Sequence, residues 1–172
     1  MVDWAQAGIE FVAVLVGVIA GFEFDRFRDW GTRNKEKVEF LKLLREELDE
    51  NLKMLKEETY PKFKDEFGYM PTQGLRVDTW HALSDRVALV KSATLRKEVL
   101  TTYAKFDMYE RTLSRYLDIC YTLLILPDNS ENEEILRSNI KLHAGTIVAQ
   151  LKGILDLIAR VIAGIDDELH DC

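Results

Sequence analysis

The chain has few cysteines and lacks the short motifs that hold metals or phosphates. Cys120 and Cys172 are its 2 cysteines, and they form no C-x-x-C pair. Such cysteine usage suits a reducing compartment and argues against a disulfide scaffold. There is no glycine-rich phosphate loop, and no nucleophile stands beside a base and an orienting carboxylate. The sequence therefore predicts a protein that is not an enzyme and has no cofactor or metal.

Positive charge is also scarce. The 23 Lys and Arg residues are outnumbered by 30 Asp and Glu residues, which gives a net charge of −7. This balance disfavours a nucleic-acid partner, because phosphate binding needs clustered basic surface. No Lys or Arg precedes Arg26, and basic residues gather directly after it. We interpret Arg26, Arg28, Arg33 and Lys35 as contacts to anionic lipid headgroups.

Long apolar runs are missing apart from one near the N-terminus. Phe11 to Phe22 is an uninterrupted run of 12 residues, a length that fits a buried core helix or a signal-peptide core as well as a membrane helix. From Trp4 to Phe24, however, the chain offers about 20 residues, or roughly 30 Å of helix, which matches a bilayer core. Trp4 and Trp30 bracket this stretch, as indole rings at lipid headgroups do. We therefore expect a transmembrane helix, with a buried core helix and a cleaved signal as alternatives.

The distribution of charge predicts the orientation of this helix. Because basic residues crowd its carboxyl side, the positive-inside tendency places the N-terminus outside and the C-terminal domain in the cytoplasm. We divide the chain into residues 1–31, the transmembrane helix with its basic juxtamembrane segment, and residues 32–172, one cytoplasmic domain.

One face of the membrane helix has the features of an interface. Ala13, Gly17 and Gly21 follow a small-x-x-x-small pattern, which lets helix backbones approach closely and predicts a homo-oligomer. Gln6 and Glu10 share that face. An ionised carboxylate in a membrane usually turns toward protein or water, so this pair permits an ion-conducting pore or pairing with another membrane subunit. The alternative is that Glu10 lies near the interface and reaches the headgroups.

Helical periodicity continues through the cytoplasmic domain. From Arg33 to Thr59 the apolar residues recur every three or four positions, and Tyr60–Gly74 is predicted to be a connector because it contains two prolines. A short helix is expected over Arg76–Val90. The apolar positions of the first seam are Val38, Leu41, Leu44, Leu48, Leu52 and Leu55.

Two further long helices follow. Ser92 is predicted to cap one of them, which Pro127 ends, and Ser130 to Glu133 fits a capping box for the last. The expected seams are Leu95, Val99, Thr102, Phe106, Tyr109, Leu113, Tyr116, Cys120 and Leu124, and then Ile140, Ala144, Ile147, Leu151, Ile154, Ile158, Val161, Ile165 and Leu169. The second seam fits either a bundle or an intermolecular coiled coil, and we prefer the bundle because neighbouring helices can cover it.

The predicted fold is all-α, with one N-terminal transmembrane helix followed by a cytoplasmic antiparallel helical bundle of three long helices and one short helix. Tyr103, Phe106, Tyr109, Tyr116 and Tyr121 are expected in its core. The acidic run from Arg45 to Glu50 is expected to be a solvated helix face.

The stretch from Gly21 to Trp30 (GFEFDRFRDW), the Lys/Glu-rich helix after it and Thr79 to Leu83 (TWHAL) together carry a resemblance. The chain resembles uncharacterised prokaryotic single-pass membrane proteins, from families of unknown function. The resemblance implies a membrane helix with a cytoplasmic helical domain, and it implies no activity, cofactor or functional residue.

From the sequence we therefore expect a non-enzymatic single-pass membrane protein that homo-oligomerises through its glycine-rich helix, with an ion-conducting pore as one form of that assembly. An accessory subunit of a larger membrane complex is the alternative. A membrane-tethered enzyme or sensor is the least favoured, because no catalytic constellation is evident.

Overall fold

A computed structural model describes residues 31–126 and 132–171 of the chain. These residues form helices and loops with no strand among them, which confirms the all-α class. The predicted membrane span from Trp4 to Phe24 lies outside the described residues. So does Ser130 of the predicted capping box.

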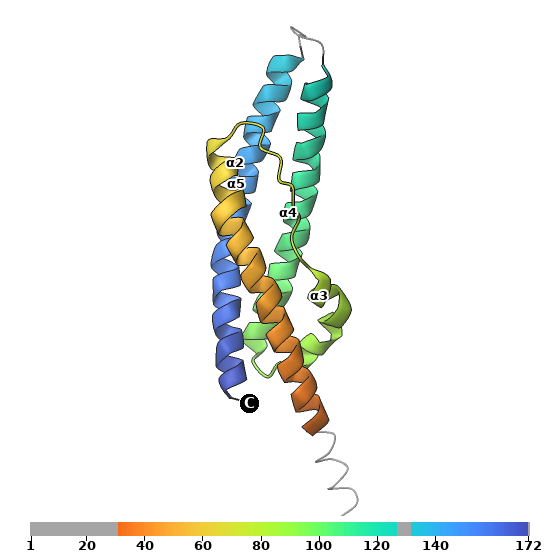
Figure 1. The fold of residues 1–172 in the computed structure, drawn as a ribbon, viewed down its shortest axis with the longest axis vertical. Helices are drawn as coiled ribbons and strands as arrows, with labels where there is room; N and C mark the ends of the chain where they lie inside the picture. The colour runs from red at the N-terminus through yellow and green to blue at the C-terminus, as the bar shows by residue number, and fades with distance from the viewer. Residues whose placement is uncertain (1–30, 127–131, 172) are drawn as a thin grey trace, which may run out of the picture.

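Three long helical rods make up the bundle (Figure 1). We call residues 31–65 the N-terminal rod. It is α-helical over residues 31–54, continues as the π-helical turn η1 (Leu55–Thr59) and ends with α2 (Tyr60–Asp65). The other rods are α4 (Ala93–Ile125) and α5 (Glu133–His170), which form an antiparallel hairpin. The bundle prediction is confirmed, although the N-terminal rod and α4 run in the same direction.

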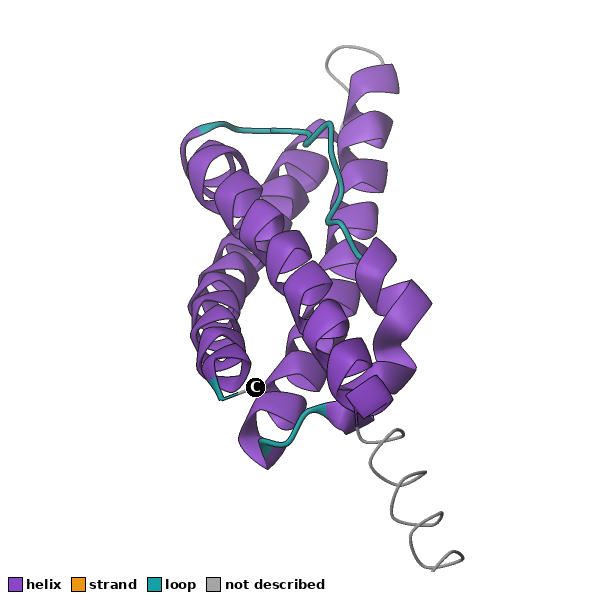
Figure 2. Cartoon of the chain, turned by 60° about the horizontal axis from the view of Figure 1, so that its bottom comes forward, coloured by secondary structure: helices purple, strands orange, loops and turns teal. Residues whose placement is uncertain are grey.

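That shared direction follows from the connector between the two rods. Residues 66–92 return the chain along the bundle and include α3 (Asp78–Leu83) and the 3₁₀ helix η2 (Ser84–Leu89). The short predicted helix is therefore present, and its second half is 3₁₀. Figures 1 and 2 show the start of the N-terminal rod, the start of α4 and the end of α5 at one end of the bundle, which we call the proximal end.

The predicted break at Tyr60 is wrong, because the N-terminal rod continues through Pro61 to Asp65. Proline has no N–H and its ring clashes with the carbonyl four residues earlier in a regular α-helix. Here the π-helical turn η1 precedes it, and the Tyr60 N–H bonds to the Leu55 carbonyl five residues back. The widened turn accommodates Pro61. The rod ends where Glu66 becomes extended, and Gly68 then adopts a positive φ of 71°.

The predicted seams form the core. Their members are buried or partly buried with one exception, Leu124, which is 68% exposed. Tyr121 was also expected in the core and is 58% exposed. Both lie near the end of α4, where the α4–α5 hairpin extends past the end of α2 (Figure 1). The N-terminal rod ends too early to cover them. Cys120, one turn before, is a buried free thiol.

Candidate functional site

Most of the residues that the sequence singles out belong to the N-terminal segment that precedes residue 31. Outside the described residues lie Trp4, Gln6, Glu10, Ala13, Gly17, Gly21, Arg26, Arg28 and Trp30. Arg33 and Lys35 are described, and both are exposed in the first turns of helix 31–54, at the proximal end. Within residues 31–126 and 132–171, no helix is both long and apolar enough to cross a bilayer.

A buried ion pair ties the proximal end together. The Lys37 ammonium lies 3.3 Å from Glu168 Oε1, and the two side chains are only 3% and 9% exposed. Glu168 also accepts hydrogen bonds from the backbone N–H groups of Lys91 (2.8 Å) and Ser92 (3.2 Å). We call Lys37, Glu168 and these two N–H groups the proximal clamp. It joins the N-terminal rod, α5 and the start of α4.

The clamp favours the ionised form of its carboxylate. Burial alone raises the pKa of Glu168, but the two backbone N–H groups and the Lys37 ammonium outweigh it and lower the pKa below its ordinary value. Nearby, Ser92 Oγ accepts from the Leu95 N–H at 3.2 Å, which confirms the predicted N-cap of α4. An exposed pair, Arg45 Nε to Asp166 Oδ1 at 2.6 Å, adds a second link to α5.

A second group of buried polar residues lies further along the N-terminal rod. Glu47, expected to be solvated, is only 5% exposed and accepts hydrogen bonds from the Tyr103 hydroxyl and from the Thr79 N–H at 2.6 Å. Asn51 pairs with the backbone of Arg76 in both directions, at 2.7 and 2.8 Å. These bonds attach the connector to the rod, and they explain why polar residues occupy core positions.

The helical spacing of the N-terminal rod indicates that Glu47 and Asn51 are buried. Lys37, Leu44 and Asn51 recur every seven residues, as do Phe40 and Glu47, so the polar residues share the face of the apolar seam. Composition alone suggested a solvated acidic run. Its burial is explained by the positions of the connector, which supplies the Thr79 N–H, and of α4, which supplies the Tyr103 hydroxyl.

A groove of about 450 Å³ lies between α3 and α4, and we call it the α3–α4 groove. Trp80 stacks on Tyr103, with ring centroids 4.3 Å apart and planes within 7°. Burial, and then the bond to Glu47, raises the pKa of Tyr103 far above its ordinary value, so its hydroxyl stays a donor. The groove is lined by Val77, Trp80, His81, Leu100, Tyr103, Ala104, Phe106, Asp107 and Glu110.

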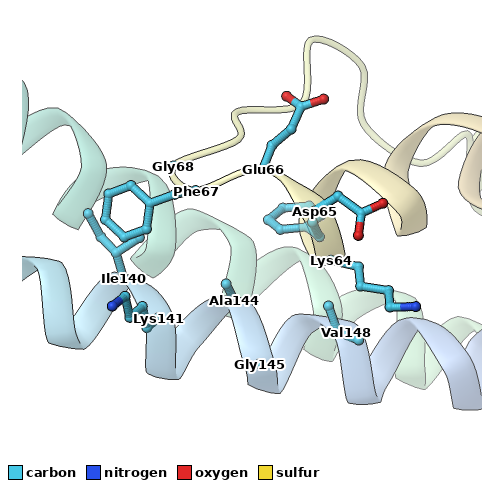
Figure 3. A pocket seen from close by; sticks show the side chains of 11 residues that line it. Lys64, Asp65, Glu66, Phe67, Gly68, Ile140, Lys141, Ala144, Gly145 and Val148 are labelled. Atoms are coloured by element: carbon cyan, nitrogen blue, oxygen red, sulfur yellow. The ribbon is translucent and has the colours of Figure 1, made fainter.

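A second groove, of about 440 Å³, lies between the end of α2 and α5, and we call it the α2–α5 groove (Figure 3). Phe67 lies beside Ile140 in this view, and Ala144 and Val148 continue the apolar floor along α5. Its charges are balanced. Lys64 and Lys141 are matched by Asp65 and Glu66.

The free end of the α4–α5 hairpin exposes large apolar side chains, and we call this surface the hairpin tip. Its members are Tyr121, Leu124, Ile125, Ile135 and Leu142, which are 58% to 82% exposed. Where exposed apolar side chains adjoin one another, they mark interaction sites more often than scattered single residues do.

Neither a search for metal-ligand groups nor a comparison with known proteins indicates a function. Within the described part of the chain, no group of three or more His, Cys, Asp or Glu residues is arranged to hold a metal ion. The chain matches no protein-family model, no curated protein and no solved structure. Its function has to be inferred from its own residues.

Proposed function

We propose that the chain is a non-enzymatic, single-pass membrane protein that homo-oligomerises through its glycine-rich N-terminal segment, with its bundle in the cytoplasm. The observation that supports this most is the proximal clamp. Lys37 lies about 13 residues after Phe24, the end of the proposed span. The clamp fixes this part of the rod to α4 and α5, so that the three rods are held together at the end of the bundle where the chain enters it.

Two basic residues at the proximal end are placed to meet a bilayer. Arg33 and Lys35 are exposed there, where they would contact anionic headgroups, while Asp166, Asp167 and Asp171 are the exposed acidic residues at the end of α5. In this arrangement the hairpin tip points away from the membrane. Because the rods are tied together at the proximal end, association of the membrane segments brings whole bundles side by side.

The mass of the full chain in a nonionic detergent tests the proposal. We expect a defined homo-oligomer for residues 1–172 and a smaller species for residues 32–172. Gly17→Leu and Gly21→Leu should reduce the mass, because a larger side chain keeps the helices apart. Ile19→Leu, on another face of the segment, is the control and should leave the mass unchanged. An oligomer that tolerates both glycine substitutions would overturn the proposed interface.

Glu10 allows the pore form of the assembly to be examined separately. Helices packed tightly through Gly17 and Gly21 leave no lumen on that face, so a pore requires more subunits that are spaced apart. In a pore, Glu10→Gln should change the cation selectivity of currents across planar bilayers. If the purified chain carries no current, or if selectivity is the same for both proteins, Glu10 is not a pore residue.

The hairpin tip favours a second candidate, an accessory subunit of a larger membrane complex. Its apolar side chains lie at the far end of α4, a helix of 33 residues that spans about 50 Å. That distance removes them from the bilayer, so a protein is the natural contact. Purification from native membranes distinguishes the candidates, because an accessory subunit elutes with other chains and a homo-oligomer elutes with copies of itself.

A further inference from the structure

We propose that the α3–α4 groove binds a small organic cation that carries an apolar group. Its volume of about 450 Å³ lies within the range of about 300 to 1,000 Å³ that is typical of small-molecule sites. The apolar part of the wall comes from Val77, Leu100 and Ala104, and the stacked rings of Trp80 and Tyr103 supply the aromatic part. Tryptophan is the aromatic side chain that attracts cations most strongly.

Negative charge is concentrated along the same wall. Tyr103, Asp107 and Glu110 follow one another at i, i+4 and i+7, so they lie on one face of α4. Asp107 is paired with Arg111, but both side chains are exposed, and water-exposed pairs of this kind are weak enough to exchange with a ligand. Glu110 accepts the Leu75 N–H with one oxygen at 3.2 Å, and its second oxygen is a further acceptor.

A buried carboxylate behind the aromatic wall strengthens this preference. Glu47, on the N-terminal rod, accepts a hydrogen bond from the Tyr103 hydroxyl. Tyr103 is itself only 5% exposed and its ring is covered by Trp80, so the contribution of Glu47 is the negative charge that it adds on this side of the groove. The α2–α5 groove is similar in size but has two basic and two acidic side chains, so it has no comparable preference for positive charge.

The groove is also held in shape without a ligand. Trp80 is fixed by its stacking on Tyr103, and the preceding residues are fixed by Glu47 at Thr79 and by Asn51 at Arg76. A preformed wall reduces the ordering that binding would otherwise require.

Two matched probes test the proposal on the full chain in a nonionic detergent. We expect 2-phenylethylammonium to bind with a dissociation constant of about 1 mM or tighter, and the neutral 2-phenylethanol to bind at least about fivefold more weakly. Binding is measured by calorimetry. It is also measured by Trp80 fluorescence in a Trp4→Phe, Trp30→Phe background, in which Trp80 is the only one of the 3 tryptophans that remains.

Substitutions then locate the site. D107N with E110Q should weaken 2-phenylethylammonium binding about tenfold and leave the circular dichroism spectrum unchanged, because both residues lie at the exposed face of α4 and E110Q keeps an oxygen for the Leu75 N–H. Asp65→Asn removes a charge from the α2–α5 groove and should have no effect. Equal binding of the ammonium and the alcohol would overturn the proposal. Unchanged ammonium binding by the D107N, E110Q protein would also overturn it.

Discussion

At the scale of single residues, Lys37 and Glu168 are the charged pair that the bundle has taken out of water. Removing one partner of such a pair leaves the other buried without its counter-charge, and this costs more than an exposed pair contributes. The lowered pKa of Glu168 shows that the surrounding donors favour its charged form. The pair therefore controls how firmly the proximal end is held.

We expect Lys37→Met to lower the free energy of unfolding by about 3 kcal/mol, because Glu168 loses its buried cation. Urea denaturation followed by circular dichroism measures this change. The control is Glu133→Gln, which removes an exposed pair with Arg137 and should change stability by less than about 0.5 kcal/mol. A Lys37→Met protein as stable as the control would show that the clamp contributes little.

Glu168 also makes stability depend on pH. Because its pKa is lower in the folded protein, its contribution is complete above the ordinary glutamate pKa of 4.5 and is lost as the pH falls through the lower folded value. We expect the stability difference between the natural protein and Glu168→Gln to be constant at neutral pH and to shrink in acid. Denaturation midpoints of both proteins at several pH values test this, and a difference that grows in acid would contradict it.

At the scale of elements, the local sequence predicts most features of each rod, but it does not predict the course of the helix at a proline or the burial of a residue whose partners lie on another element. The Ser92 cap and the seams of α4 and α5 follow from local hydrogen bonding and periodicity, so they were predictable. The course of the rod through Pro61 was not, because a proline indicates a break and η1 avoids it by widening the turn. The burial of Glu47 likewise depends on a connector distant in sequence.

Two glycines of α5 form a matched pair for testing helix packing. A Cβ at Gly145 would meet nothing within 4 Å, so Gly145→Ala should stabilise the protein by about 0.5 to 1 kcal/mol through helix propensity. At Gly164 it would lie 3.0 Å from Leu95 Cδ1. Because Leu95 must shift, Gly164→Ala should stabilise the protein less than Gly145→Ala does, or should destabilise it. Thermal unfolding of the two variants makes the comparison, and an equal gain would contradict close packing at Gly164.

At the scale of the whole molecule, the hairpin is longer than the rod that covers it. Leu124 and Ile125 are therefore 68% and 82% exposed. Changing both to Lys should leave the free energy of unfolding within about 0.5 kcal/mol of the natural value, because the side chains are already in water. If the hairpin tip contacts another protein, that protein should no longer copurify with the variant. A large loss of stability would instead place these residues in the core.

The sequence by itself determined the all-α class, the seams of the rods and the cap of α4, because each depends on contacts within a few residues along one helix. It also indicated which N-terminal residues to test for membrane association. Only the tertiary structure decided which side chains gather at the proximal clamp and around the α3–α4 groove. Those sites combine residues from the N-terminal rod, the connector, α4 and α5, and their proximity depends on how far each rod extends and on the path by which residues 66–92 return along the bundle.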